Sequence, residues 1–217
     1  MIHRKTLAYC IGFGAALWAT PALVHPHVFA EAKLKITVAE DGTVKNLSHT
    51  WRFDDVFSDT VLFEFDKDQD GKINDKEAAD ISKTITDSTG DYNYFEAVDD
   101  NGKDVKMARP ANLRGTFDGK ILVVTFDNAP AEPMIVKGRV SFGIYDPTFY
   151  TSIDFVDDTD LSIEGLKPSC KPAIIRPDGD EAIAANQSKL TDAFFSDPQG
   201  TDVSKIFATR MEITCNP

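Results

Sequence analysis

The sequence is short of basic residues, has no excess of glycine or proline, and contains few long apolar runs, and each of these features excludes a class of protein. Of 217 residues, 23 are Lys or Arg against 35 Asp or Glu, so the formal net charge is −12 at pH 7. So acidic a chain lacks the basic face that nucleic acid or anionic lipid requires. With 13 Gly, 11 Pro and 10% aromatic residues, it is neither collagen-like nor of low complexity. A hydrophobic fraction of 42% indicates a globular protein with a buried core.

The only apolar run of note lies at the start of the chain. Residues 1–22 combine a basic beginning at Arg4 and Lys5, an apolar stretch over 7–18, and small residues ending at Ala22. This order is typical of a cleavable secretory signal, and the run is shorter than the roughly 20 apolar residues of a membrane span. We therefore expect export to the periplasm without membrane insertion of the mature chain. An uncleaved N-terminal anchor is the alternative.

Cysteine is scarce as well. Removal of residues 1–22 would also remove Cys10 and leave two cysteines, Cys170 and Cys215. An even number of cysteines in an exported protein predicts a disulfide bond between them. Two free, buried thiols are the alternative.

The chain after the signal contains no linker long enough to separate two domains. An alternating apolar pattern on either side of Asp41-Gly42 predicts a hairpin, and most later segments are also strand-like. We predict an α+β fold over residues 23–217, a mostly antiparallel, sandwich-like β domain with a helix-loop-helix inserted at about 55–87. The predicted helices are 55–65, 75–86 and 181–195. The predicted strands are 28–38, 44–53, 92–98, 105–108, 113–117, 121–126, 135–145, 150–156 and 206–215.

The acidic stretch from Asp66 to Glu77 matches a metal-binding pattern. The spacing Asp-x-Asp-x-Asp-Gly followed by a final Glu is that of the EF-hand calcium loop. Calcium is a hard cation that takes six to eight oxygen ligands, and Gly71 allows the sharp turn around it. The expected ligands are the carboxylates of Asp66, Asp68, Asp70 and Glu77, the backbone carbonyl of Lys72, and Asn74 through a water.

The calcium loop is predicted to stand alone. The other acidic cluster, at 157–160, lacks both the glycine and the final Glu of the pattern. A single loop cannot form the paired lobe of a cytosolic sensor, so we expect a site of extracellular affinity, of order 10⁻⁴ to 10⁻³ M. The alternative is a solvated acidic turn without an ion.

Histidine is also rare after the signal, where only three remain. His25 and His27 lie close to the expected new N-terminus, where an amine and imidazoles form a candidate site for Ni²⁺, Cu²⁺ or Zn²⁺. Polar residues on a frayed terminus are the alternative. His49 shares a strand face with Trp51 and Phe53, which favours a buried, satisfied histidine over a third metal ligand.

Four segments together resemble a known family. They are His25-Pro26-His27-Val28-Phe29, Trp51-Arg52-Phe53-Asp54, the acidic loop, and Tyr145-Asp146-Pro147-Thr148-Phe149-Tyr150. The sequence resembles a family of uncharacterised bacterial periplasmic proteins, often labelled as the periplasmic component of an ABC-type transport system. The resemblance implies export and an association with nickel, cobalt or zinc transporters, and it implies no catalytic residues.

Taken together, these features predict an exported, periplasmic calcium-binding protein that is not an enzyme. We expect an accessory or binding component of a transition-metal transport system, with a membrane transporter as partner and no nucleic acid. Two alternatives belong to other classes: a calcium-stabilised hydrolase of unknown substrate, and a purely structural or interaction module. The chain is short for a two-lobed solute-binding protein, which weakens the label of substrate-binding component.

Overall fold

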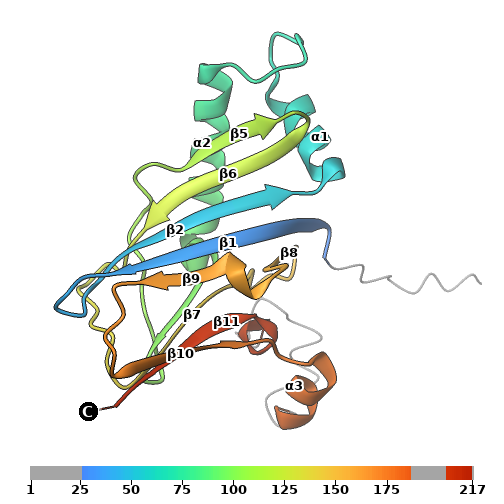
Figure 1. Ribbon diagram of the computed structural model, residues 1–217. Helices are drawn as coiled ribbons and strands as arrows, with labels where there is room; N and C mark the ends of the chain where they lie inside the picture. Colours follow the sequence, from blue (N-terminus) through green and yellow to red (C-terminus); the bar gives the residue numbers. More distant parts are fainter. Residues whose placement is uncertain (1–25, 187–203, 217) are drawn as a thin grey trace, which may run out of the picture.

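The computed structural model describes residues 26–186 and 204–216 (Figure 1). Within these residues, a six-stranded sheet contains the strands nearest the N-terminus, and β1 and β2 lie at its centre. Its order is β5 (Arg114–Asp118), β6 (Ile121–Asn128), β2 (Val44–Phe53), β1 (Val28–Val38) and β8 (Thr151–Asp154), while β9 (Leu161–Glu164) also pairs with β1.

A second sheet carries the C-terminal strands. In the described part of the chain it has five strands, in the order β10 (Cys170–Ile175), β11 (Arg210–Cys215), β7 (Arg139–Ile144), β3 (Glu96–Asp100) and β4 (Lys103–Asp104). Buried residues of both sheets belong to one continuous hydrophobic core. The fold is therefore mainly β, with helices and mostly antiparallel sheets.

The central hairpin follows directly from its sequence. Along β1 every second residue, from Val28 to Val38, is buried, and the residues between them face outward. Alternation with a period of two is the signature of a strand that has one face on the core. In the antiparallel ladder with β2, Leu34 lies opposite His49, which confirms the hairpin predicted around Asp41-Gly42.

Two helices follow β2 and extend from the six-stranded sheet (Figure 1). They are α1 (Asp55–Phe65) and α2 (Asp75–Thr89). The buried Ser58 hydroxyl of α1 accepts a hydrogen bond from the backbone N–H of Leu122 in β6. A Cβ at Gly115 of β5 would lie 2.7 Å from a methyl carbon of Ile81, so only glycine allows α2 to approach β5 this closely.

The segment after α2 differs from the prediction. Residues 92–95 alternate like a strand, but they belong to a 3-10 turn, η1 (Gly90–Phe95), and β3 begins only at Glu96. Asn93, Tyr94 and Phe95 all have a positive φ, between 54° and 63°. Three consecutive left-handed residues that are not glycine cannot be read from a hydrophobic pattern, because the side chains themselves disfavour that backbone.

Several other boundaries also need correction. No strand forms over 105–108, where only an isolated bridge joins Met107 to Pro130. Strands β9 and β10 were not predicted, and β8 and β9 pair with β1 in parallel rather than antiparallel fashion. The helix α3 (Gly179–Ala185) begins before residue 181 and has Asn186 as its C-cap, and residues 187–195 of the predicted stretch lie outside the described residues.

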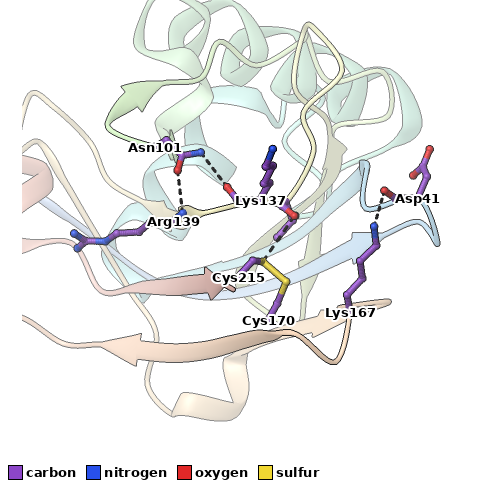
Figure 2. The surroundings of a disulfide bond; sticks show 8 residues. Asp41, Asn101, Lys137, Arg139, Lys167, Cys170 and Cys215 are labelled. Atoms are coloured by element: carbon purple, nitrogen blue, oxygen red, sulfur yellow. Dashed lines mark hydrogen bonds between the residues drawn. A yellow bond between two sulfur atoms is a disulfide. The ribbon is translucent and has the colours of Figure 1, made fainter. Parts of the chain in front are cut away.

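The predicted disulfide between Cys170 and Cys215 is confirmed (Figure 2). The two residues lie directly opposite each other at the ends of β10 and β11, with Cα atoms 4.0 Å apart. The backbone N–H of Cys215 also donates to the carbonyl of Gly138, next to β7. The bond therefore closes the end of the second sheet, where three of its strands meet.

Candidate functional site

The acidic loop connects α1 to α2, and both of its ends are defined by hydrogen bonds. At the start, the backbone N–H of Asp66 donates to the carbonyl of Leu62 and ends α1. At the other end, Asn74 is the N-cap of α2, and its side chain accepts from the backbone N–H groups of Lys76 and Glu77. Asn and Asp favour this position because their side-chain oxygen satisfies a helix N–H that has no partner within the helix.

Three of the predicted ligands come together in this loop. Carboxylate oxygens of Asp66, Asp68 and Asp70 all lie within 4.8 Å of one another. Asp66 accepts hydrogen bonds from the backbone N–H groups of Asp70 and Gly71, so the chain curls around its carboxylate. Such a cluster of hard oxygen donors suits a divalent cation such as Ca²⁺ or Mg²⁺ better than a soft metal.

Glu77 faces the loop from the first turn of α2. Its side chain is 4% exposed, and its two carboxylate oxygens accept from the backbone N–H groups of Lys67 and Asn74, at 2.7 and 2.9 Å. With Asn74 it forms a capping box, in which each residue accepts from the backbone of the other. Lys72 is exposed, and its backbone N–H donates to the side chain of Asp70. Glu77 therefore connects the two ends of the loop.

The loop carboxylates affect one another electrostatically. The pKa of Asp68 is raised, first by partial desolvation within the loop and then by the nearby charges of Asp70 and Glu77. Like charges that are held together favour the protonated form of one of them. A bound cation would remove this repulsion.

The two histidines within residues 26–186 and 204–216, His27 and His49, have different surroundings. His25 lies outside the described residues, so the His25–His27 chelate stays a prediction. His27 is exposed just before β1, where its backbone N–H donates to the carbonyl of Tyr150 and its ring lies 5.2 Å from the Tyr150 ring. His49 is buried, as predicted for a residue on the core face of β2.

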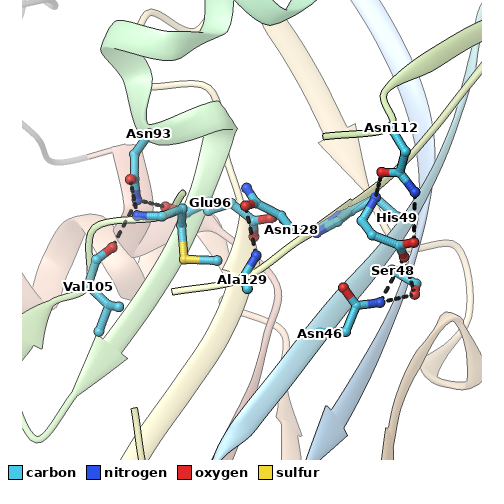
Figure 3. Close-up of polar contacts among 11 residues, drawn as sticks. Asn46, Ser48, His49, Asn93, Glu96, Val105, Asn112, Asn128 and Ala129 are labelled. Carbon is cyan, nitrogen blue, oxygen red and sulfur yellow. Dashed lines mark hydrogen bonds and ion pairs between the residues drawn. The ribbon is translucent and has the colours of Figure 1, made fainter. Parts of the chain in front are cut away.

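The partner of His49 was not predicted. His49 Nε2 lies 2.6 Å from a carboxylate oxygen of Glu96, and both side chains are fully buried. His49 belongs to β2 and Glu96 to β3, so this pair joins the two sheets (Figure 3). The sequence placed His49 on a core face, but contacts between two sheets depend on packing that no local pattern specifies.

Polar atoms without a hydrogen-bond partner are concentrated around this pair. In residues 26–186 and 204–216, the buried side-chain nitrogens and oxygens that make no hydrogen bond belong to four residues: His49, Trp51, Glu96 and Asn128. The short contact between His49 Nε2 and Glu96 therefore lacks the geometry of a hydrogen bond. The His49 ring stacks on Phe126 at 4.4 Å. Such groups are normally satisfied, so this part of the core is an exception in an otherwise well-paired interior.

Comparison with known proteins extends over almost the whole chain. A protein of Haemophilus influenzae, named "Uncharacterized protein", is 26% identical over 196 residues, which cover 89% of this chain and 92% of that protein. Residues 10–215 match the family model described as "Protein of unknown function (DUF1007)". This range includes the acidic loop and both disulfide cysteines. The chain therefore belongs to the DUF1007 family.

Proposed function

We propose that the protein is exported and binds calcium through the loop from Asp66 to Glu77, in an EF-hand arrangement inserted into a sandwich-like β domain. The observation that carries this proposal is the convergence of the Asp66, Asp68 and Asp70 carboxylates between two helices. Glu77 lies at the same loop and needs only to turn its carboxylate from two backbone N–H groups to the ion. The Lys72 carbonyl and Asn74 would complete the oxygen ligands.

Calcium binding is expected to stabilise the fold. The ion would relieve repulsion among clustered carboxylates in a chain whose net charge is already −12. A ligand that binds only the folded state adds RT ln(1 + [L]/Kd), about 2.7 kcal/mol when free calcium exceeds Kd a hundredfold. The melting temperature should therefore rise from EDTA to excess calcium, and magnesium should replace calcium poorly because it requires tighter octahedral geometry.

Two matched variants test the assignment of the loop. Glu77→Gln should lose most of the calcium-dependent rise in melting temperature, because an amide is a weaker ligand than a carboxylate. Asp80→Asn changes an exposed acid of the same helix just beyond the loop and should keep the full rise. For each variant, the melting temperature in excess calcium is compared with that of the same variant in EDTA. A parent protein whose melting temperature ignores calcium would show that the loop is only an acidic turn.

Export is supported by two features of the chain. Residues 1–22 have the order of a secretory signal, and Cys170 and Cys215 form a disulfide, as is usual outside the cytoplasm. Within the described residues, no helix is long and apolar enough to cross a membrane. Sequencing the N-terminus of the exported protein would test the cleavage after Ala22.

The role proposed for the exported protein is that of a non-enzymatic accessory or binding component of a transition-metal transport system. Its support is the sequence resemblance together with His25 and His27 near the expected new N-terminus. A double variant, His25→Ala and His27→Ala, should lose Ni²⁺ or Cu²⁺ binding measured by calorimetry while calcium binding is unchanged. Equal transition-metal affinity in the variant and the parent would remove this part of the proposal.

A further inference from the structure

We propose that a cavity at one end of the six-stranded sheet binds an organic ammonium ion. The cavity has a volume of about 450 Å³ and lies between α2, η1, the start of β1 and the turn at 146–151. Its size falls within the range of small-molecule sites. The inference is independent of calcium, because no residue of the acidic loop lines the cavity.

Six of the fourteen residues that line the cavity are aromatic. Trp51 is buried and stacks with Phe95 at 6.2 Å between ring centres, while Tyr92 follows at 6.3 Å from Phe95. Tyr92 and Tyr150 also line the cavity and are partly exposed, at 38% and 50%. The faces of aromatic rings attract cations through their quadrupoles, most strongly when water is excluded.

A buried carboxylate completes the cavity. Asp146 is 5% exposed and lines the wall formed by the turn. Its oxygens accept three hydrogen bonds, from the backbone N–H and hydroxyl of Thr148 and from the backbone N–H of Thr151. A carboxylate offers about four acceptor positions, so one remains for a ligand.

The charges around the cavity favour a cation. No Lys, Arg or His is among the described residues that line it, although the His27 ring lies 5.2 Å from the ring of Tyr150, and Asp146 has no ion pair with a described residue. A buried negative charge without a counter-ion is unfavourable, and a positively charged ligand would compensate it. The acidic chain as a whole would also attract cations.

Backbone strain is concentrated on two walls of the same cavity. Six residues other than glycine have a positive φ in the described chain, and four of them, Asn93, Tyr94, Phe95 and Phe149, lie in η1 or in the turn at 146–151. Asn93 supports η1 with side-chain hydrogen bonds to Glu96, Val105 and Met107. Strained backbone held by surrounding contacts is characteristic of ligand sites, because it fixes side chains in otherwise unfavourable positions.

A single tryptophan makes the proposal testable in the exported protein. Trp18 belongs to the expected signal, so Trp51 would be the only tryptophan of the mature chain and would report on the cavity by fluorescence. With calcium in excess throughout, choline and benzyltrimethylammonium serve as probes, and calorimetry gives their affinities. The neutral carbon isostere of choline, dimethylbutanol, should bind about tenfold more weakly because it has the shape without the charge.

Variants separate the contribution of the aromatic walls from that of the carboxylate. The double variant Tyr92→Leu, Tyr150→Leu keeps apolar volume but removes two ring faces, and it should weaken benzyltrimethylammonium about tenfold. Phe63→Leu, which changes an aromatic residue 90% exposed on α1 and away from the cavity, should leave the affinity unchanged. Asp146→Asn should also weaken binding, provided that its circular dichroism is that of the parent.

Three results would overturn the proposal. They are equal affinity for choline and dimethylbutanol, no response to either cation at millimolar concentration, and unchanged affinity in the double tyrosine variant. None of the three depends on Asp146→Asn, so they decide the matter even if that variant fails to fold. Loss of calcium binding in Glu77→Gln would leave all three readouts in place, so the two proposals fail separately.

Discussion

At the level of a single residue, Asp127 shows how one carboxylate of β6 can connect its strand to β2 and to the loop before β5. Its oxygens accept hydrogen bonds from Asn46, Ser48 and Asn112, at 2.6 to 2.9 Å. These bonds lower the pKa of Asp127, with the Ser48 hydroxyl making the largest contribution. A carboxyl group with a lowered pKa in the folded state contributes stability above its unfolded pKa and loses it as the pH falls through the folded value.

Asp127→Asn should therefore destabilise the protein by about 1 kcal/mol at neutral pH. The difference from the parent should shrink as the pH falls below about 4, the ordinary pKa of an unfolded Asp, and through the lower pKa of the folded Asp127. Urea unfolding at several pH values measures both effects. Asp59→Asn, at an exposed position of α1, is the matched control and should show little change at any pH. A difference for Asp127→Asn that is independent of pH would contradict this account.

At the level of elements, the two sheets are joined by the pair of His49 on β2 and Glu96 on β3. Removing one member of a buried pair leaves the other charged or polar and unpaired, whereas replacing both by apolar residues is much less unfavourable. Glu96→Leu alone should reduce the free energy of unfolding by about 3 kcal/mol. The double variant His49→Phe, Glu96→Leu should recover a large part of this loss.

A double-mutant cycle by chemical denaturation, including His49→Phe alone, gives the coupling between the two residues. If the losses of unfolding free energy in the two single variants simply add up in the double variant, the two side chains do not interact. Because Trp51 neighbours His49, its fluorescence also shows whether the core around the pair keeps its packing.

The sequence predicts best those elements whose formation depends on residues close together in the chain. The bounds of β1, β2 and α1 agree with the structure, because alternation, helical spacing and the Asp54 cap all act within a few residues. The gathering of Asp66, Asp68 and Asp70 is likewise a local property of one loop. The left-handed turn at Asn93 depends instead on hydrogen bonds to Val105 and Met107, which are distant in sequence. The cavity at Trp51 and Asp146 is formed by still more distant segments.

At the level of the whole molecule, the disulfide acts mainly on the unfolded chain. Cys170 and Cys215 are separated by 45 residues in sequence, and closing a loop of this length removes about 4 kcal/mol of conformational freedom in the entropy model. The double variant Cys170→Ser, Cys215→Ser should therefore lose about 2 to 4 kcal/mol of unfolding free energy. Adding a reductant should destabilise the parent by a similar amount and leave the variant unchanged. A reductant that also destabilises the variant would show that the effect is not due to this bond.

The parallel pairing of β1 with β8 and β9 has a consequence for the order of assembly. The β1–β2 hairpin can form as soon as residue 53 is available, but the other edge of β1 gains its partners only when residues 151–164 arrive. A chain exported as we propose, N-terminus first, would thus present an open strand edge while about a hundred further residues follow. Such long-range pairing is slow, and an unpaired edge is prone to association with other chains. The early folding intermediate, rather than the finished protein, is then the state in which a chaperone or a protease would meet β1.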